Sequence, residues 1–249
     1  MLEKSDIASL ATQIVRLIED SELSKLSREL LSKNWIIARL NENIAAVYDT
    51  LKLGSVVDMR FLCLAQLAHE LNRLQLPGAI AEVGVSKGNF SARIRTLFPG
   101  RTLYLFDTFE GFDQEQLEYE LKNNLVGFSK RRLTSAYKEI SVEIALKAIG
   151  DSELCIVKKG VFPDSARDVN EKFVFVSLDV DLYQPILAGL KFFYEHLVPG
   201  GYILVHDCID TSKYRGAKVA VREFCCEYKI GYVPLPDTNS SVVITKAKN

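Results

Sequence analysis

The stretch Phe173-Val-Phe-Val-Ser-Leu-Asp179-Val-Asp181-Leu-Tyr183 decides the fold that the rest of the sequence has to support. It is an apolar run that ends in two acids, Asp179 and Asp181, one residue apart. Such a run is typical of a strand that is buried on both faces of a parallel sheet. Because ligands bind at the carboxyl ends of the strands in these sheets, we expect both acids at the mouth of a site.

A second apolar run, Gly201-Tyr-Ile-Leu-Val205, ends in the same way, in His206 and Asp207. If the two strands lie side by side, Asp179, Asp181 and Asp207 meet at one edge of the sheet. Two bare carboxylates about 4 Å apart repel by roughly 4 kcal/mol at an effective dielectric constant of about 20. The cluster therefore favours a bound divalent cation, or a proton on one of the acids.

The short apolar segment 79–85 carries Glu82 and runs into a glycine turn. The turn, Gly84-Val-Ser-Lys-Gly88, leads into a helix that reaches residue 98. Glycines let the backbone approach a ligand, and the free N–H groups of a helix N-terminus favour an anion. Asp107 ends the next strand about 20 residues later, where an acid accepts hydrogen bonds from ribose hydroxyls. These features favour an adenosine-containing cofactor, although a tight structural turn would leave the same glycine pattern.

His206 and Asp181 each leave an alternative open. Carboxylates suit Mg²⁺ and an imidazole suits Mn²⁺, Fe²⁺ or Zn²⁺ better, so His206 is a metal ligand, a supporting residue or a surface histidine. Asp181 is a proton acceptor at the site or an acid at a helix start, since Pro185 follows closely and suits an early helical position. A metal beside an adenosine cofactor favours group transfer to an oxygen, because the metal acidifies a bound hydroxyl.

Strand and helix patterns alternate along the chain, which predicts an α/β fold with a mostly parallel, doubly wound sheet. An antiparallel edge is expected at the C-terminal end, where the last two strands form a hairpin-like pair. Helical periodicity over 1–53 predicts an N-terminal helical layer that also suits a subunit interface, so we expect a homo-oligomer. Strands are expected at 79–85, 102–107, 153–158, 173–183, 201–205, 231–235 and 241–245, and helices at 56–74, 141–149, 185–197 and 214–227.

The chain of 249 residues has an ordinary globular composition, with 48% hydrophobic and 25% charged residues. Its formal net charge of −1 argues against a general nucleic-acid or membrane surface. No apolar stretch approaches the ~20 residues that span a bilayer, and the N-terminus lacks the pattern of a signal peptide. The five cysteines form no C-x-x-C pair, which fits reduced thiols in a cytoplasm.

Six segments resemble, in order, the motifs of the macrocin O-methyltransferase family, whose members methylate sugar hydroxyls of macrolides and related natural products. The resemblance covers about residues 78–227. It implies a class I S-adenosylmethionine-dependent methyltransferase domain at 77–249 after a helical region at 1–76, a divalent metal that is usually Mg²⁺, and a sugar or glycosylated metabolite as acceptor. The segments are Ala81-Glu-Val-Gly-Val-Ser-Lys-Gly88, Phe106-Asp-Thr-Phe-Glu-Gly-Phe112, Gly160-Val-Phe-Pro-Asp164, Leu178-Asp-Val-Asp-Leu-Tyr183, Pro199-Gly-Gly-Tyr-Ile-Leu-Val-His-Asp207 and Gly216-Ala-Lys-Val-Ala-Val-Arg-Glu-Phe224.

Carried over position by position, the resemblance implies a metal site, a general base and a cofactor site. The metal ligands would be Asp179, His206 and Asp207, and Asp181 would be the base. His206 stands where the family has an acid and Val180 where it has glycine, so Mn²⁺ or another ion competes with Mg²⁺ for the site. The cofactor residues would be Glu82, Gly84, Gly88, Ser91, Asp107, Thr108, Phe109, Gly160, Phe162 and Asp179.

Three other functions remain open. A catechol-type O-methyltransferase also carries acids after its fourth and fifth strands, but typically has Asn where Cys208 stands. A nicotinamide-dependent oxidoreductase would share the sheet but needs a G-x-G-x-x-G turn. A non-catalytic binding protein would have lost its metal site, which His206 allows. The segment 109–138 is expected to be either a solvated helix and loop or a lid that orders over the ligand.

Overall fold

The structure, a computed structural model, describes residues 59–127, 139–150, 152–208, 215–237 and 240–247. These residues belong to a compact unit that spans Asp58–Asn249, and a separate unit spans Met1–Val57. The predicted helical layer over 1–53 and the late part of segment 109–138 lie outside the described residues. The predicted domain boundary between residues 76 and 77 remains a prediction.

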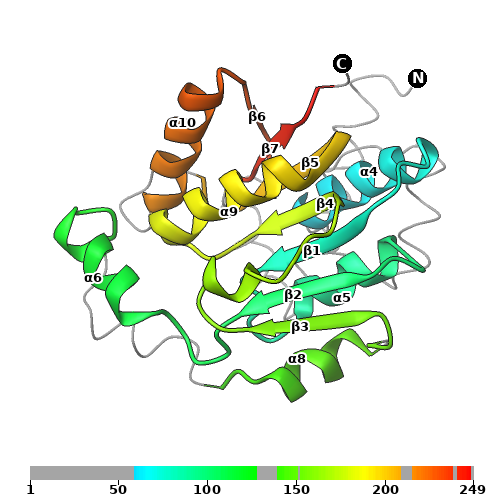
Figure 1. Cartoon of the computed structure of the whole chain (residues 1–249), viewed down its shortest axis with the longest axis horizontal. Coiled ribbons are helices and arrows are strands. Elements are labelled where there is room, and N and C mark those ends of the chain that lie inside the picture. The colour runs from blue at the N-terminus through cyan, green and yellow to red at the C-terminus, as the bar shows by residue number, and fades with distance from the viewer. Residues whose placement is uncertain (1–58, 128–138, 151, 209–214, 238–239, 248–249) are drawn as a thin grey trace, which may run out of the picture. The chain divides into compact units, whose positions relative to one another are not determined.

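A sheet of seven strands forms the centre of the unit, in the order β3-β2-β1-β4-β5-β7-β6 (Figure 1). Neighbours from β3 to β5 run parallel, and β7 runs antiparallel to both β5 and β6. The order proceeds outward from β1 in both directions, which is the pattern of a doubly wound sheet. The strands are β1 (Ala79–Val83), β2 (Leu103–Asp107), β3 (Cys155–Lys159), β4 (Phe173–Leu178), β5 (Leu197–Val205), β6 (Val233–Pro234) and β7 (Val242–Thr245).

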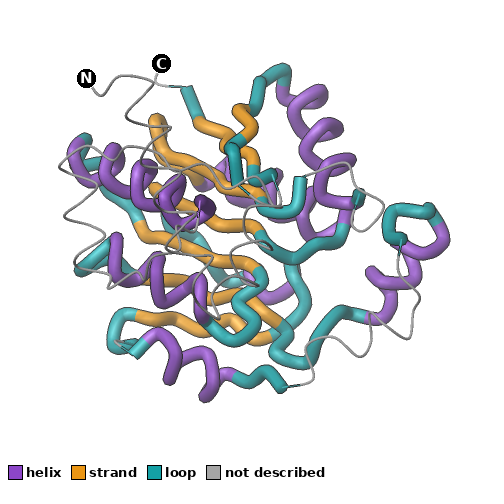
Figure 2. The backbone as a smooth tube through the Cα atoms, turned by 180° about the vertical axis from the view of Figure 1, so that it is seen from behind, coloured by secondary structure: helices purple, strands orange, loops and turns teal. Residues whose placement is uncertain are grey.

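Helices cover both faces of the sheet (Figures 1 and 2). The helices α4, α5 and α8 pack against one another on one face, and α9 packs with α10 on the other. The helix α6 lies beyond the carboxyl ends of the strands. The helices are α4 (Met59–Arg73), α5 (Asn89–Leu97), α6 (Gln114–Lys122), α8 (Val142–Ile149), the short η1 (Asp164–Ala166), α9 (Tyr183–His196) and α10 (Gly216–Tyr228).

The two central strands, β1 and β4, are buried along their whole length. Because both faces are covered, they carry continuous apolar runs instead of an alternating pattern. The register pairs Val83 with Leu178, and Leu178 with Val205. The residues that follow β1, β4 and β5 therefore emerge side by side at one edge of the sheet.

The predicted fold class, a mostly parallel α/β sheet with antiparallel pairing at its C-terminal end, is confirmed. The differences lie at the ends of elements. The helix predicted from Pro185 begins at Tyr183, so the proline occupies the first turn, where its missing N–H costs nothing. The strand predicted from Gly201 begins at Leu197, which already pairs with β4 at Phe173. Within the described part of the chain, every helix is too short or too polar to cross a membrane.

Candidate active site

The segments that follow β1, β2, β3, β4 and β5 line one cavity of about 270 Å³ at the carboxyl edge of the sheet. The start of α6, the turn before it and Ile140 also line the cavity. Several predicted site residues line this cavity, namely Gly84, Asp107, Thr108, Gly160, Phe162, Asp179, Asp181, His206 and Asp207. The lining does not include Glu82, Gly88, Ser91 and Phe109.

The two glycines of the turn serve different contacts. Gly84 has a φ of 92°, and a Cβ at this position would lie 2.1 Å from the carbonyl oxygen of Asp179. Any side chain there would push the ends of β1 and β4 apart, so the cavity floor requires glycine. Gly88 has a φ of 79°, and a Cβ there would lie 2.6 Å from the carbonyl oxygen of Ala145 in α8. The second glycine is explained by the packing of α5 on α8.

Asp107 ends β2 and faces the glycine turn. One carboxylate oxygen accepts a hydrogen bond from the Ser86 N–H at 2.8 Å, and the other accepts one from the Phe109 N–H at 2.7 Å. The Thr108 hydroxyl, 3.5 Å from the carboxylate, donates to the carbonyl of Gly111 at 2.6 Å. These bonds fix the carboxylate in one orientation and leave lone pairs on both oxygens for ligand hydroxyls. Phe109 contributes its backbone, since its side chain is buried.

Glu82 and Ser91 form a buried pair that supports the end of β1. Their exposed fractions are 1% and 0%, and the Ser91 hydroxyl donates a hydrogen bond to Glu82. Burial raises the pKa of Glu82 to about 8, against the opposing effect of the bond from Ser91. In this geometry the pair acts beneath the cavity lining and does not form part of it.

Phe162 joins the wall after β3 to α6. Its carbonyl accepts a hydrogen bond from Gln116 Nε2 at 3.1 Å. Its ring lies edge-on to Phe106, with 5.6 Å between centroids, and stacks on Phe193 at 5.7 Å. The Phe162 wall is therefore held by the aromatic core between the sheet and α9. Gly160, two residues before Phe162, has a φ of 141°.

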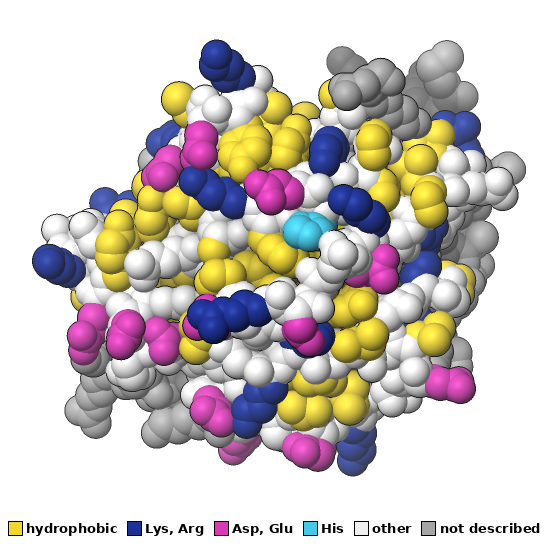
Figure 3. All heavy atoms as spheres, in the orientation of Figure 1, with side chains coloured by type: hydrophobic (Ala, Val, Ile, Leu, Met, Phe, Trp, Pro, Cys, Tyr) yellow, Lys and Arg dark blue, Asp and Glu magenta, His cyan; other side chains and the backbone are white. Residues whose placement is uncertain are grey.

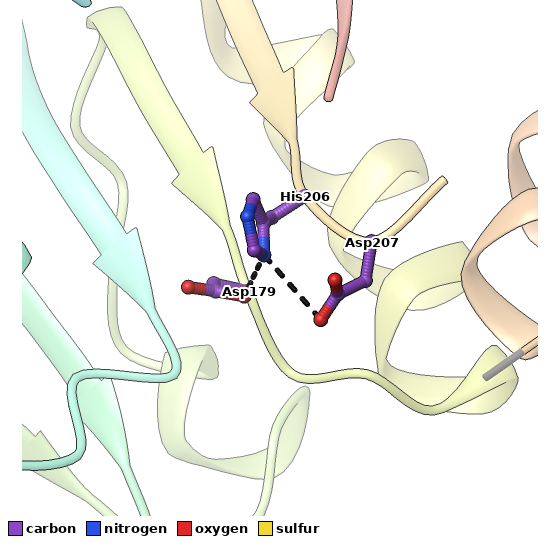
Figure 4. Close-up of side chains that lie close together, drawn as sticks. All are labelled: Asp179, His206 and Asp207. Atoms are coloured by element: carbon purple, nitrogen blue, oxygen red, sulfur yellow. Dashed lines mark hydrogen bonds and ion pairs between the residues drawn. The ribbon is translucent and has the colours of Figure 1, made fainter. Parts of the chain in front are cut away.

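Asp179, His206 and Asp207 form a cluster at the ends of β4 and β5 (Figure 4). The Nδ1 atom of His206 lies 3.0 Å from Asp179 Oδ1 and 3.4 Å from Asp207 Oδ2. The other oxygen of Asp179, Oδ2, accepts a hydrogen bond from Nη2 of Arg60 at 2.8 Å. The register of the sheet fixes this meeting, because the His206 N–H donates to the Leu178 carbonyl at 2.9 Å.

The charges of this cluster stabilise one another. Burial alone would lower the pKa of His206, but hydrogen bonds with Asp179 and Asp207 raise it to about 10. Burial alone would raise the pKa of Asp179, but Arg60 and His206 lower it well below its usual value. The pKa of Asp207 is also lowered, against burial, by hydrogen bonds with His206 and Asp181. Arg60 and His206 thus favour the charged form of Asp179, and His206 favours the charged form of Asp207.

Asp181 lies next to this cluster with an exposed fraction of 6% and a φ of 60°. It shares a hydrogen bond with Asp207. The N-cap of α9 is Leu182, so Asp181 precedes the cap and is not the residue that caps the helix. This placement favours the alternative in which Asp181 faces the site.

The cluster offers a donor set that fits a divalent cation. One ligand atom from each of Asp179, His206 and Asp207 lies within 4.8 Å of the other two. Two carboxylates and an imidazole suit Mn²⁺, Fe²⁺ or Zn²⁺, and the carboxylates alone suit Mg²⁺. The His206 ring nitrogen would have to release its proton to bind a metal.

Sequence reasoning missed Arg60 and the contribution of α6. Arg60 is 119 positions away from Asp179 in the sequence, and no local pattern links the two residues. Asp113 and Gln116 of the α6 region also line the cavity. Asp113 caps α6 by accepting hydrogen bonds from two backbone N–H groups, and an acid followed three residues later by Gln116 is a signal for a helix start.

The Macrocin-O-methyltransferase (TylF) family model matches residues 45–239 of the chain. A search of curated proteins found no match. Among solved structures, the chain is similar to the O-methyltransferase NovP, with 19% identity and a TM-score of 0.60 over 76% of this chain and 80% of that one.

Two further structures share the fold. The calicheamicin methyltransferase CalS11 has 19% identity and a TM-score of 0.61 over 91% of this chain and 93% of that one, and its apo structure is described as a TDP-rhamnose 3'-O-methyltransferase. TomG from Streptomyces achromogenes, solved in complex with SAM, has 15% identity and a TM-score of 0.50 over 86% of this chain and 93% of that one.

Proposed function

Because the chain belongs to the macrocin O-methyltransferase family, we propose that it methylates a hydroxyl of a sugar or a glycosylated small molecule with the help of a divalent metal. S-adenosylmethionine-dependent O-methylation follows from the family itself. One arrangement supports the finer proposal: the glycine turn and Asp107 line the same cavity as Asp179, His206 and Asp207. A cofactor and an acceptor would meet there.

The β1 and β2 ends suit the cofactor. Gly84 lets the backbone approach the ligand, and the fixed carboxylate of Asp107 would accept hydrogen bonds from the ribose hydroxyls. The predicted contacts of Gly160, Phe162 and Thr108 are proposed on the same ground, since all three line the cavity. Glu82, Gly88, Ser91 and Phe109 would support this wall from behind it.

The β4 and β5 ends suit the acceptor. When bound, S-adenosylmethionine supplies an electrophilic methyl group on a sulfonium, and a divalent metal acidifies the acceptor hydroxyl. Asp179, His206 and Asp207 would hold that metal, while Asp181 would take the proton of the hydroxyl. The deprotonated oxygen would then be the acceptor of the methyl group. The cavity would contribute by holding the acceptor hydroxyl beside the methyl donor.

The acceptor class is supported by polar groups on the α6 side of the cavity. Asp113 and Gln116 bring a carboxylate and an amide to the lining. Such groups form hydrogen bonds with the hydroxyls of a sugar. CalS11, which shares the fold, is described as acting on TDP-rhamnose.

The cysteines and the surface charges bear on the location and the partners of the protein. All five cysteines are free thiols, which suits a reducing cytoplasm. Figure 3 shows acidic, basic and hydrophobic side chains intermixed on one face of the molecule, without a large field of one sign. We propose that the protein binds a small-molecule substrate and forms a homo-oligomer.

Two experiments test this function. Isothermal titration calorimetry with S-adenosylhomocysteine and with NAD tests the cofactor: we expect binding of the first, and binding of NAD alone would favour the oxidoreductase. Methylation of a panel of glycosides, with and without EDTA, tests the metal. The proposal is supported if EDTA abolishes turnover and added Mn²⁺ or Mg²⁺ restores it. Full turnover in EDTA would contradict the proposed need for a metal.

A further inference from the structure

Arg60 connects α4 to the cluster of Asp179, His206 and Asp207. It is the second residue of α4, and its Nη2 atom donates a hydrogen bond to Asp179 Oδ2 at 2.8 Å. Its guanidinium carbon lies 3.8 Å from the centre of the Phe90 ring in α5. One guanidinium group thus contacts an aromatic ring and a carboxylate at the same time.

This ion pair is sheltered from solvent. The exposed fractions of the Arg60 and Asp179 side chains are 16% and 20%. Exposed ion pairs contribute about 0–1 kcal/mol to the stability of the folded state. An ion pair that is sheltered and has a defined geometry also fixes the orientation of its two side chains. Among the described residues, Arg60 Nε is buried without a hydrogen-bond partner, which is a cost that the other Arg60 contacts must offset.

The two oxygens of Asp179 have separate partners. Oδ2 faces Arg60, and Oδ1 faces Nδ1 of His206 at 3.0 Å. The carboxylate of an aspartate otherwise rotates over a broad range. Arg60 therefore decides which oxygen is presented to the cluster. Groups that hydrogen-bond to metal ligands orient them, and their loss typically weakens metal binding by about 10–100-fold.

We propose that Arg60, held flat by Phe90, is a positioning residue that orients Asp179 so that a single oxygen faces the metal site. The inference rests on the metal part of the proposed function. It assigns a task to α4 in a reaction whose proposed metal ligands and base all follow β4 and β5. Arg60 does not touch the acceptor or the cofactor in this account; it acts through Asp179.

Mn²⁺ binding to the full-length protein, measured by electron paramagnetic resonance with S-adenosylhomocysteine present, tests the inference. Arg60→Met should weaken Mn²⁺ binding by about tenfold or more. If Arg60 were only a positive charge beside the metal, its removal would tighten binding. Equal or tighter binding by Arg60→Met therefore overturns the proposal.

Two more variants separate orientation from charge and from folding. Phe90→Leu keeps the guanidinium but removes the ring, so we expect about threefold to tenfold weaker Mn²⁺ binding, and wild-type affinity would overturn the role of Phe90. Arg93→Met removes the other arginine–ring contact between α4 and α5, in which Arg93 lies 4.9 Å from the Phe61 ring centre, and should retain wild-type affinity. An equal loss in Arg93→Met would indicate a general packing effect and overturn the proposal.

The outcomes also distinguish this inference from the proposed function. If the wild type binds S-adenosylhomocysteine but no Mn²⁺, the metal and the role of Arg60 both fail. If the wild type binds Mn²⁺ and Arg60→Met binds it equally well, only the role of Arg60 fails. All variants should keep the wild-type circular dichroism spectrum and S-adenosylhomocysteine affinity.

Discussion

At the scale of residues, Asp181 and Asp207 occupy unusual backbone conformations. Their φ values are 60° and 54°, which non-glycine residues seldom adopt. Each residue follows the end of a buried strand, and the two side chains share a hydrogen bond. Such conformations persist where the surrounding structure imposes them, and they cluster at functional sites. These backbone conformations bring the side chains of Asp181 and Asp207 together at the cavity.

Asp181→Asn tests the role of the base. Asparagine keeps the size of the side chain but cannot take a proton, so turnover should fall by about 10²–10⁴-fold. Mn²⁺ and S-adenosylhomocysteine affinities should stay within about threefold of wild type, because the proposed ligands are untouched. Single-turnover methylation and calorimetry measure the two effects separately. Retained turnover would leave Asp181 with a structural role alone.

Asp107→Asn tests the cofactor site. The substitution replaces one acceptor oxygen by an amide that faces the N–H of Ser86 or Phe109. A hydrogen bond to a charged group contributes about 1.5–3 kcal/mol, so S-adenosylhomocysteine affinity should fall by about tenfold to a hundredfold. Calorimetry measures this change, and thermal melting checks the fold. An unchanged affinity would remove Asp107 from the cofactor site.

The sequence predicted which acids lie at the ends of the strands, for a physical reason. A buried strand is recognised by its apolar run, and the acids after it share an edge because parallel strands end together. The contact between Arg60 and Asp179 was not predicted, because the two residues are 119 positions apart and the pattern of a single helix does not indicate such a partner. Gly88 was predicted to contact the cofactor, but glycine is also needed there because a Cβ would collide with α8. A local sequence pattern does not show this contact.

At the scale of elements, α6 is fastened to the rest of the unit by a buried carboxylate. Glu120 is 1% exposed and accepts a hydrogen bond from the N–H of Tyr183, the first residue of α9. A Cβ on Gly216, the first residue of α10, would lie 2.7 Å from the Glu120 carboxylate. Glu120 therefore packs against the N-termini of two helices. The early part of the proposed lid segment is a docked helix, and the rest lies outside the described residues.

The Glu120 carboxyl predicts a pH-dependent stability. Burial raises its pKa to about 7, against the opposing hydrogen bond from Tyr183. The folded state thus holds the proton between about pH 4.5 and 7 while the unfolded state has released it, so stability falls as pH rises through this window. We expect a loss on the order of 1–2 kcal/mol after partial solvent screening.

Glu120→Gln should remove this dependence. Urea unfolding at pH 5 and pH 8 should give the variant and the wild type similar stability at about pH 5, and a more stable variant at about pH 8. Glu118→Gln, an exposed position on the same helix, serves as the control and should change little. A less stable Glu120→Gln at pH 8 would instead show that the helix N-termini favour the anion more than burial opposes it.

At the scale of the whole molecule, the strand order places the proposed cofactor and acceptor halves of the cavity on either side of β1 and β4. The β2 side carries Asp107, and the β5 side carries His206 and Asp207. The strand order reverses between β1 and β4, although the strands stay parallel, and ligands bind at such a point in open α/β sheets. A ligand that spans this position contacts both halves of the sheet at once. Binding should therefore stabilise the whole unit.

A ligand that contacts both halves of the sheet should raise the melting temperature by an amount that depends on the ligand class. S-adenosylhomocysteine at about 100 times its dissociation constant should stabilise the folded state by about 2.7 kcal/mol, which for a chain of this size raises the melting temperature by about 5–10 °C. NAD at the same concentration should give no shift, because Asp107 follows a turn without the G-x-G-x-x-G spacing. Differential scanning fluorimetry measures both, with Asp107→Asn as the control that should need more ligand for the same shift. Both ligands contain the adenosine that Asp107 would hold, and they differ in the group that they carry toward Asp179. An equal shift with NAD would therefore contradict a site that is specific for the methyl donor.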